Sequence, residues 1–224
     1  MSESFLRRAL NGHLLDQEQA RSVFEEMSRG ELSEIEIAAF LGALHARGEQ
    51  PSEIAGAAEA FRSAAQHFTT TAPDVIDVVG TGGDGVGTIN ISTASAFVAA
   101  SMGLKVAKHG NRAVSSKAGA ADLIEAAGIP LDLSPASSAK LLERTGFCFL
   151  FAQKYHPAMR YVAPVRGALK NPTIFNLIGP LVNPAPLSSQ VLGVGKPELL
   201  DVVAKALASL GLKHALVVHG SGTD

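Results

Sequence analysis

Cysteine is almost absent from the chain, which has only Cys148 among its 224 residues. A single cysteine excludes an internal disulfide and a zinc site built from cysteines. Cys148 lies in the apolar run Phe147–Phe151, so we expect a buried, unreactive thiol. A reducing, cytoplasmic setting fits this cysteine usage.

Long apolar runs and an excess of one charge are also missing. No run of about 18 apolar residues occurs, so the sequence predicts no membrane-spanning helix. The N-terminus has no signal-type apolar stretch. The net charge of −2 gives no strong field for nucleic acid or acidic lipid. We therefore expect a protein that binds neither nucleic acid nor membrane.

Residues 1–70 have the pattern of a small helical domain. Ser33 and Glu36 form a capping box at the start of the apolar-striped run Ile35–Ala46. Pro51 starts a further alanine-rich helix. No residue here suggests chemistry, so we expect packing or dimerisation as the role of this domain.

From residue 74 onward, short β-rich runs alternate with helical patterns. The expected strands are Val75–Val79, Leu104–Ala107, Phe147–Phe151, Val191–Val194 and Ala215–Val218. Such alternation predicts βαβ units and a mostly parallel sheet. The fold class is therefore α/β, with a small N-terminal helical domain and a larger α/β domain over residues 74–224. Ligands of such sheets bind at the carboxyl ends of the strands.

A glycine-rich segment at residues 79–93 joins an expected strand to an expected helix. Its glycines allow backbone N–H groups to approach an anion closely, and the following helix N-terminus adds unpaired donors. Asp84 could hold Mg²⁺ through water. No Walker lysine follows, and the acidic residue of a dinucleotide fingerprint is missing. The segment predicts a phosphate or pyrophosphate site, with a tight capped turn as the alternative.

A second segment, residues 108–122, places Lys108, His109, Arg112 and Lys117 between a strand and a helix. Basic residues among serines and glycines suit a multiply charged phosphate ligand. A solvated charged loop is the alternative.

With these segments the chain resembles the anthranilate phosphoribosyltransferase family. The matching motifs are Gly80–Asp84, Asn90–Thr93, Lys108–Arg112, Phe151–Met159, Val165–Arg166, Thr173–Leu181 and Asn183–Pro184, in this order. The resemblance as a whole runs from about residue 35 to the end of the chain. The resemblance implies transfer of phosphoribosyl from phosphoribosyl pyrophosphate to anthranilate in tryptophan biosynthesis.

The resemblance also implies the architecture. A helical domain, joined by helices from about residues 157–185, is hinged to the α/β domain, and the active site lies in the cleft between them. The family implies a homodimer formed through the helical domain. Pyrimidine nucleoside phosphorylases share this architecture and are one rival reading; phosphate-dependent cleavage of thymidine or uridine would identify them. A non-catalytic nucleic-acid-binding relative is another, which the net charge disfavours.

The site residues are carried over from the family motifs. For phosphoribosyl pyrophosphate they are Gly80, Thr81, Gly82, Gly83, Asp84, Thr88, Asn90, Ser92, Thr93, Lys108, Ser116 and Gly119. For anthranilate they are Gly80, His109, Gly110, Asn111, His156, Arg166 and Gly179. Ser92 and Asp224 are the implied Mg²⁺ ligands. As alternatives, His156 could cap a helix, while Asn176 and Asn183 are expected to stabilise turns.

The implied chemistry is displacement at the anomeric carbon of ribose through an oxocarbenium-like state. The aromatic amine is neutral at pH 7, so the reaction does not demand a strong general base. We expect positioning and leaving-group stabilisation to supply the rate, and we assign no proton-transfer residue. Changes at Lys108 or Arg166 should therefore impair binding more than chemistry.

Two departures from the family matter. Pro172 stands where the family usually has arginine, which removes one basic contact. The family also has an acidic pair whose first member is Asp224, and neither the second member nor roughly the last third of the family's chain follows. We therefore expect the 224-residue chain to have low or no turnover.

Overall fold

The computed structural model describes residues 2–82, 89–113 and 118–220. Four helices come first in the chain: α1 (Ser2–Leu10), α2 (Gln17–Arg29), α3 (Glu34–Arg47) and α4 (Pro51–Ser63). The predicted capping box at Ser33 and Glu36 is confirmed at the start of α3. A second box, formed by Asp16 and Gln19, begins α2. Each box satisfies helix N–H groups that would otherwise lack partners.

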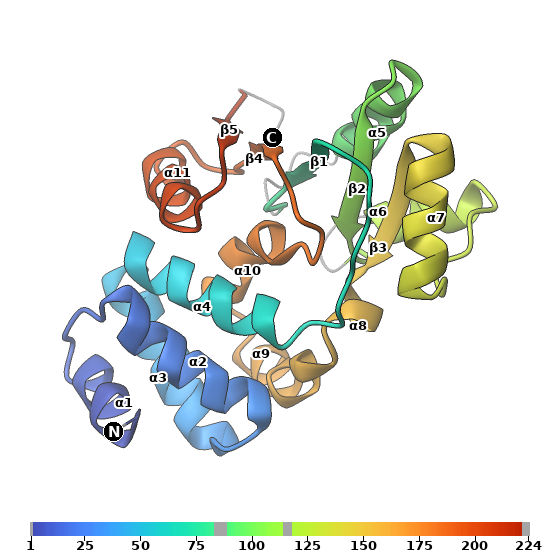
Figure 1. Cartoon of the computed structure of the whole chain (residues 1–224). Coiled ribbons are helices and arrows are strands. Elements are labelled where there is room, and N and C mark those ends of the chain that lie inside the picture. The colour runs from blue at the N-terminus through green and yellow to red at the C-terminus, as the bar shows by residue number, and fades with distance from the viewer. Residues whose placement is uncertain (1, 83–88, 114–117, 221–224) are drawn as a thin grey trace.

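Aromatic rings hold this helical layer together. Phe24 contacts Phe40 and Phe61 edge-on, with centroids 5.3 and 6.5 Å apart. Phe175, from far along the chain, contacts Phe61 at 5.0 Å. It belongs to α10 (Ile174–Ile178), which packs on α4 as α9 (Ala163–Leu169) packs on α3. Figure 1 shows α10 between α4 and the strands.

Five strands form one sheet in the order β3-β2-β1-β4-β5, and every pairing is parallel. The strands are β1 (Val75–Gly80), β2 (Lys105–Gly110), β3 (Phe147–Phe151), β4 (Ser189–Gly193) and β5 (His214–Val218). The prediction of a mostly parallel α/β sheet is thus confirmed. Each predicted strand is present, and only the ends differ by one to three residues.

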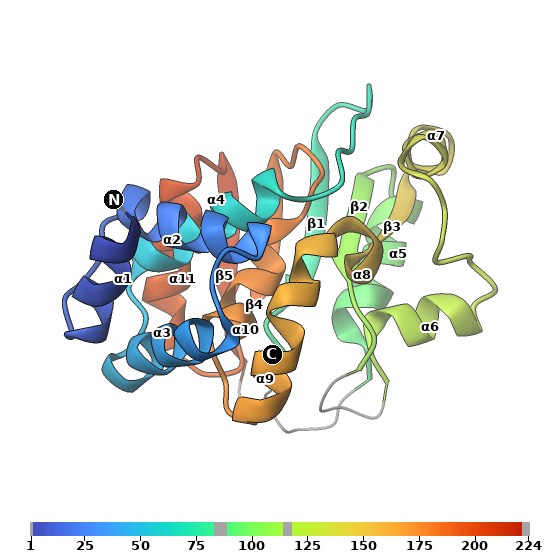
Figure 2. The ribbon, with the colours of Figure 1, turned by 90° about the horizontal axis from the view of Figure 1, so that it is seen from below.

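Helices cover both faces of the sheet. The remaining elements are α5 (Ile91–Ser101), α6 (Ala120–Ala126), α7 (Pro135–Thr145), α8 (Ala152–Tyr155), η1 (Pro157–Tyr161), η2 (Gly179–Val182) and α11 (Leu199–Ser209). In Figure 2 the four N-terminal helices lie on one side of the molecule, and α5, α6 and α7 lie on the other. Among the described residues, no helix combines the length and apolarity needed to cross a bilayer.

The sheet core contains the predicted inert thiol. Cys148 is buried beside Ala107, Leu142 and Leu150. Burial raises the pKa of its thiol to about 12. At neutral pH the side chain is therefore a small apolar group.

Candidate functional site

The strand order reverses beside β1, because β2 lies on one side of it and β4 on the other. Ligands of open α/β sheets bind at such a point, outside the carboxyl ends of the strands. Gly80 and Gly193 are register partners there, and Thr81 N–H donates to the Gly193 carbonyl over 2.9 Å. Gly82 follows with φ of +63°, which favours glycine. The predicted residues Gly83, Asp84 and Thr88 lie outside the described residues.

The N-terminus of α5 lies next along this edge. Asn90 precedes the helix, but its side chain donates to the Gly119 carbonyl over 3.1 Å and does not cap α5. Ser92 is half-buried and Thr93 is buried in the first turn. The first N–H groups of α5 therefore have no side-chain cap from Asn90. A helix end of this kind attracts an anion.

Gly119, at the start of α6, lies so close to the segment after β2 that no larger residue fits its place. A Cβ there would lie 2.3 Å from the backbone nitrogen of Ala113 and 2.8 Å from the Asn111 carbonyl oxygen. The close approach lets the Asp122 carboxylate accept from both Gly119 N–H (2.8 Å) and Ala113 N–H (3.1 Å). The loop after β2 is thus held against the start of α6.

Arg112, one of the basic residues of the second predicted loop, is paired with acidic side chains of α6. Its guanidinium forms ion pairs with Asp122 (3.0 Å) and Glu125 (2.8 Å) on α6. These carboxylates raise the pKa of Arg112 further above its ordinary value. Ser116 and Lys117 lie outside the described residues.

Lys108 is buried inside the sheet. It is 2% exposed, and its Nζ donates to the Val78 carbonyl over 2.6 Å. Burial lowers the pKa of Lys108, opposed by the charge of Asp77. Asp77 is itself fully buried, which raises the pKa of its carboxyl to about 6.

Asn183 ties this buried carboxyl to the rest of the core. Its Nδ2 donates to Asp77 (2.8 Å) and to the Ala107 carbonyl (2.9 Å), while its Oδ1 accepts from Ala185 N–H. The expected turn role of Asn183 is therefore confirmed. Asn176 lies instead in the first turn of α10, where its side chain accepts from Thr173 N–H in a capping box. Sequence reasoning did not identify Asp77; its one signal is a carboxylate inside an apolar strand.

His109 and His156 form a buried pair at the carboxyl end of β2. Their Nε2 atoms are 3.1 Å apart, and each residue is 4% exposed. One ring must donate and the other accept. Burial lowers the pKa of His156 to about 4 and holds that of His109 well below its ordinary value, so both rings are neutral at pH 7. His156 precedes η1 without capping it by a side-chain hydrogen bond.

The neighbours of this pair are also predicted site residues. The backbone of Gly179 faces the His109 ring. Gly110 lies where a Cβ would meet Ala120 and the Phe149 ring at 3.0 Å. Asn111 accepts from Gln153 through its side chain (3.3 Å), and sequence reasoning did not foresee this contact.

Arg166 lies on α9, beyond the carboxyl ends of the strands. Its guanidinium stacks on the Phe175 ring, 5.5 Å from the centroid. It is half-buried, and within the described part of the chain no carboxylate forms an ion pair with it. Burial lowers the pKa of Arg166, although arginine remains protonated. A half-buried guanidinium without an acid partner suits an anionic ligand. Asp224 lies outside the described residues.

Comparison with known proteins identifies the family. The model of the helical bundle domain of a glycosyl transferase family matches residues 3–65, and that of its a/b domain matches residues 72–224. The anthranilate phosphoribosyltransferase of Idiomarina loihiensis is 52% identical over 219 residues, which are 98% of this chain and 65% of that protein. Its counterpart in Aeromonas hydrophila is 51% identical over 98% of this chain and 64% of that protein.

Solved structures that resemble this chain belong to the same family as these relatives. Anthranilate phosphoribosyltransferase from Thermus thermophilus superimposes with a TM-score of 0.93 at 50% identity, covering 98% of this chain and 67% of that one. The Saccharomyces cerevisiae enzyme in complex with PRPP and Mg gives 0.91 at 30% identity, covering 100% and 67%. The chain therefore belongs to this glycosyl transferase family and, within it, to the anthranilate phosphoribosyltransferases. It spans about 65% of the length of the curated relatives named above.

Proposed function

We propose that the whole protein transfers the phosphoribosyl group of phosphoribosyl pyrophosphate to the amine of anthranilate and releases pyrophosphate, as a step of tryptophan biosynthesis. The observation that carries the proposal is the presence of two different anion sites. One is the glycine-lined end of β1 with the N-terminus of α5, which suits phosphate. The other is Arg166, which has no acid partner among the described residues and suits a carboxylate.

Phosphoribosyl pyrophosphate would lie against Gly80, Thr81 and Gly82 and on the first turn of α5, which carries Ser92 and Thr93. Close approach to backbone N–H groups explains the small residues at the strand ends. Lys108 lies buried beneath these residues and would add positive potential in its protonated form. Gly119 and Asn90 hold the two loops together through their hydrogen bond.

Mg²⁺ is the implied metal, and the donor chemistry fits in part. Mg²⁺ prefers oxygen ligands and is usually held by few protein groups together with substrate phosphates. The Ser92 hydroxyl is a half-buried oxygen in the first turn of α5. Asp84 and Asp224 are the proposed carboxylate partners by family resemblance. The ion would neutralise charge on the departing pyrophosphate.

Anthranilate would place its carboxylate on the fork of Arg166 and its amine toward His109. The guanidinium offers two parallel donors to a carboxylate, and the ring of Phe175 fixes its plane. Gly110, Asn111, His156 and Gly179 complete the proposed pocket.

The histidine pair has a definite electrostatic consequence. Because both rings are neutral at pH 7, they place no positive charge beside an oxocarbenium-like ribose. A neutral ring nitrogen can also accept a hydrogen bond from the anthranilate amine. We assign no proton transfer to either residue, since the rate can come from positioning and leaving-group stabilisation.

The arrangement into domains and subunits belongs to the same proposal. Residues 1–70, joined by the helices at about residues 157–185, would form the dimerisation domain, and residues 74–224 the domain that binds phosphoribosyl pyrophosphate. Packing of α9 and α10 on α3 and α4 supports this grouping. A cytoplasmic homodimer is the expected form.

Calorimetric titration of phosphoribosyl pyrophosphate with Mg²⁺ into the purified chain tests the phosphate site, and loss of anthranilate fluorescence tests turnover. We expect binding, with little turnover by the 224-residue chain and full turnover by the complete protein. No binding by a folded sample, or cleavage of thymidine by phosphate in its place, would contradict the proposed function.

A further inference from the structure

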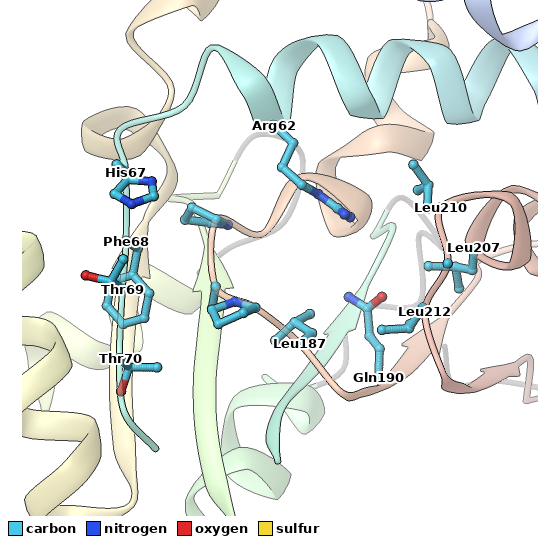
Figure 3. A pocket seen from close by; sticks show the side chains of 14 residues that line it. Arg62, His67, Phe68, Thr69, Thr70, Leu187, Gln190, Leu207, Leu210 and Leu212 are labelled. Carbon is cyan, nitrogen blue, oxygen red and sulfur yellow. The ribbon is translucent and has the colours of Figure 1, made fainter. Parts of the chain in front are cut away.

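A cavity lies away from the proposed active site. It has a volume of about 440 Å³ and lies between the end of α4, the linker after α4, and the starts of β4 and β5. Figure 3 shows the linker residues His67–Thr70 on one side and the leucines near α11 on the other. Leu187 and Leu212, which precede β4 and β5, line it. The cavity is thus at the amino-terminal half of the strands, whereas the proposed active site is at their carboxyl ends.

Two polar side chains meet in this cavity. In Figure 3, Arg62 extends from α4 and Gln190 extends from β4 toward one another. The Nη2 group of Arg62 donates to the Leu181 carbonyl. Arg62 is an exposed residue, and its remaining N–H groups make no ion pair with the described residues, although Glu59 lies one turn earlier. Glu59 already accepts from Gln17 over 2.8 Å.

Gln190 supplies a second polar group to the same cavity. The residue is 3% exposed, and its Nε2 donates to the Pro180 carbonyl over 2.8 Å. This hydrogen bond fixes the amide and leaves Oε1 as an acceptor, because no hydrogen bond to it occurs among the described residues. Gln190 lines the cavity, so this oxygen is the polar acceptor that the β4 side of the cavity offers.

Most of the rest of the lining is apolar, with His67, Thr69 and Thr70 as the other polar residues. Leu187, Leu207, Leu210 and Leu212 supply aliphatic walls, and Phe68 supplies a ring. None of the described residues that line the cavity is Asp or Glu. Apolar walls around a few convergent polar groups are the usual composition of a small-molecule site, and this volume falls in the usual range.

We propose that this cavity binds a small apolar monocarboxylate, with its carboxylate on Arg62, its apolar body on the leucines, and any hydrogen-bond donor of the ligand on Gln190 Oε1. The guanidinium matches the charge and geometry of the carboxylate. The site is separate from Arg166, so its occupation does not depend on the proposed reaction.

Calorimetric titration with 3-phenylpropionate tests the site, and 3-phenylpropanamide is the uncharged control of the same shape. We expect saturable binding of the acid and much weaker binding of the amide. Arg62→Gln should weaken binding of the acid by about 10-fold or more, since a hydrogen bond to a charged group contributes about 1.5–3 kcal/mol. Leu187→Trp, which fills the cavity and retains Arg62, should weaken binding as well. Arg166→Gln should leave it unchanged.

The variants also separate the possible failures. Circular dichroism checks that each variant is folded, and Leu187→Trp decides the outcome if Arg62→Gln is not. Equal affinity for acid and amide, or no saturable binding, overturns the proposal. Binding that survives in Leu187→Trp and disappears in Arg166→Gln assigns the acid to the proposed anthranilate site and overturns it too.

Discussion

The fully buried carboxylates of the helical layer and of the sheet have different surroundings. In the helical layer the buried Glu53 accepts hydrogen bonds from Arg47, from Leu15 N–H (3.0 Å) and from Gln50 N–H (3.1 Å). In the sheet region, burial moves the pKa of Asp77 upward and that of Lys108 downward. Glu53 is neutralised by an arginine partner, whereas burial disfavours the charged forms of Asp77 and Lys108.

The location of these groups explains the contrast. Glu53 fastens α4 to α3 and to the turn before α2, so its network stabilises packing. Asp77, Lys108 and the histidine pair lie on β1 and β2 or beside their carboxyl ends, close to the proposed phosphate and anthranilate sites. Shifted pKa values gather at functional sites because a ligand can exploit poorly solvated groups. The helical layer and the sheet region can therefore be compared residue by residue, in packing, pH response, binding and capping.

Phe61→Ala should have the largest effect. The ring fills the junction of α4, α2 and α10, so its removal should lower the free energy of unfolding by about 3–5 kcal/mol. Denaturant unfolding followed by circular dichroism measures the loss. Phe97→Ala, at the half-buried ring that packs on Phe147 in the sheet region, should cost less. An equal loss of unfolding free energy in both variants would contradict the expectation that the helical layer depends more on its aromatic packing than the sheet region does.

Acidification should destabilise the sheet region first. His156 has a pKa of about 4 in the folded chain, against an ordinary 6.5, so its stabilising contribution is complete above 6.5 and lost as pH falls to 4. The full contribution is about 3 kcal/mol. His109 acts in the same direction. Asp77 opposes them, because its raised pKa makes stability fall as pH rises from 3.8 to about 6.

Hydrogen exchange at pH 7 and 4.5, corrected for intrinsic rates, measures this effect by segment. We expect protection to decrease in β1 and β2 and to persist in α2 and α3. His156→Asn should flatten the pH dependence of global stability. Equal loss of protection in both regions, or an unchanged slope in the variant, would contradict the assignment.

Arg166→Gln should weaken anthranilate binding by about 10- to 100-fold, which corresponds to the 1.5–3 kcal/mol of a charge-assisted hydrogen bond. Calorimetry should show unchanged affinity for phosphoribosyl pyrophosphate. Arg160→Gln is the matched control, because the exposed Arg160 stacks on Tyr161 outside the proposed site. In the complete protein, KM for anthranilate should rise with kcat nearly unchanged. A collapse of kcat at constant KM would instead place Arg166 in the chemical step.

Ser33→Ala should have the smallest effect, about 1 kcal/mol, because it removes the side-chain cap of α3. Thermal unfolding is the measurement. Ser134→Ala, which removes the cap of α7 in the sheet region, is the counterpart and should cost a similar amount. A large difference between them would show that caps, as well as buried charges, differ between the regions.

Local sequence determined the elements of this fold. Capping boxes, glycines and alternating apolar runs act within a few residues, so Ser33, Glu36 and the strand Phe147–Phe151 were predicted from the sequence. The glycine loops were predicted to follow strands for the same reason, since positive φ and close backbone approach demand glycine locally. The motifs also predicted the family without any knowledge of distances.

Only the tertiary structure decided which charges are free. Arg112 and Arg166 look alike in sequence, yet α6 brings Asp122 and Glu125 to one, and α10 brings only the Phe175 ring to the other. The pairing of His109 with His156, and of Arg62 with the cavity wall at Gln190, joins residues 47 and 128 positions apart. Charge, burial and pKa depend on such long-range neighbours, because the electrostatic energy of a side chain is set by what surrounds it in space.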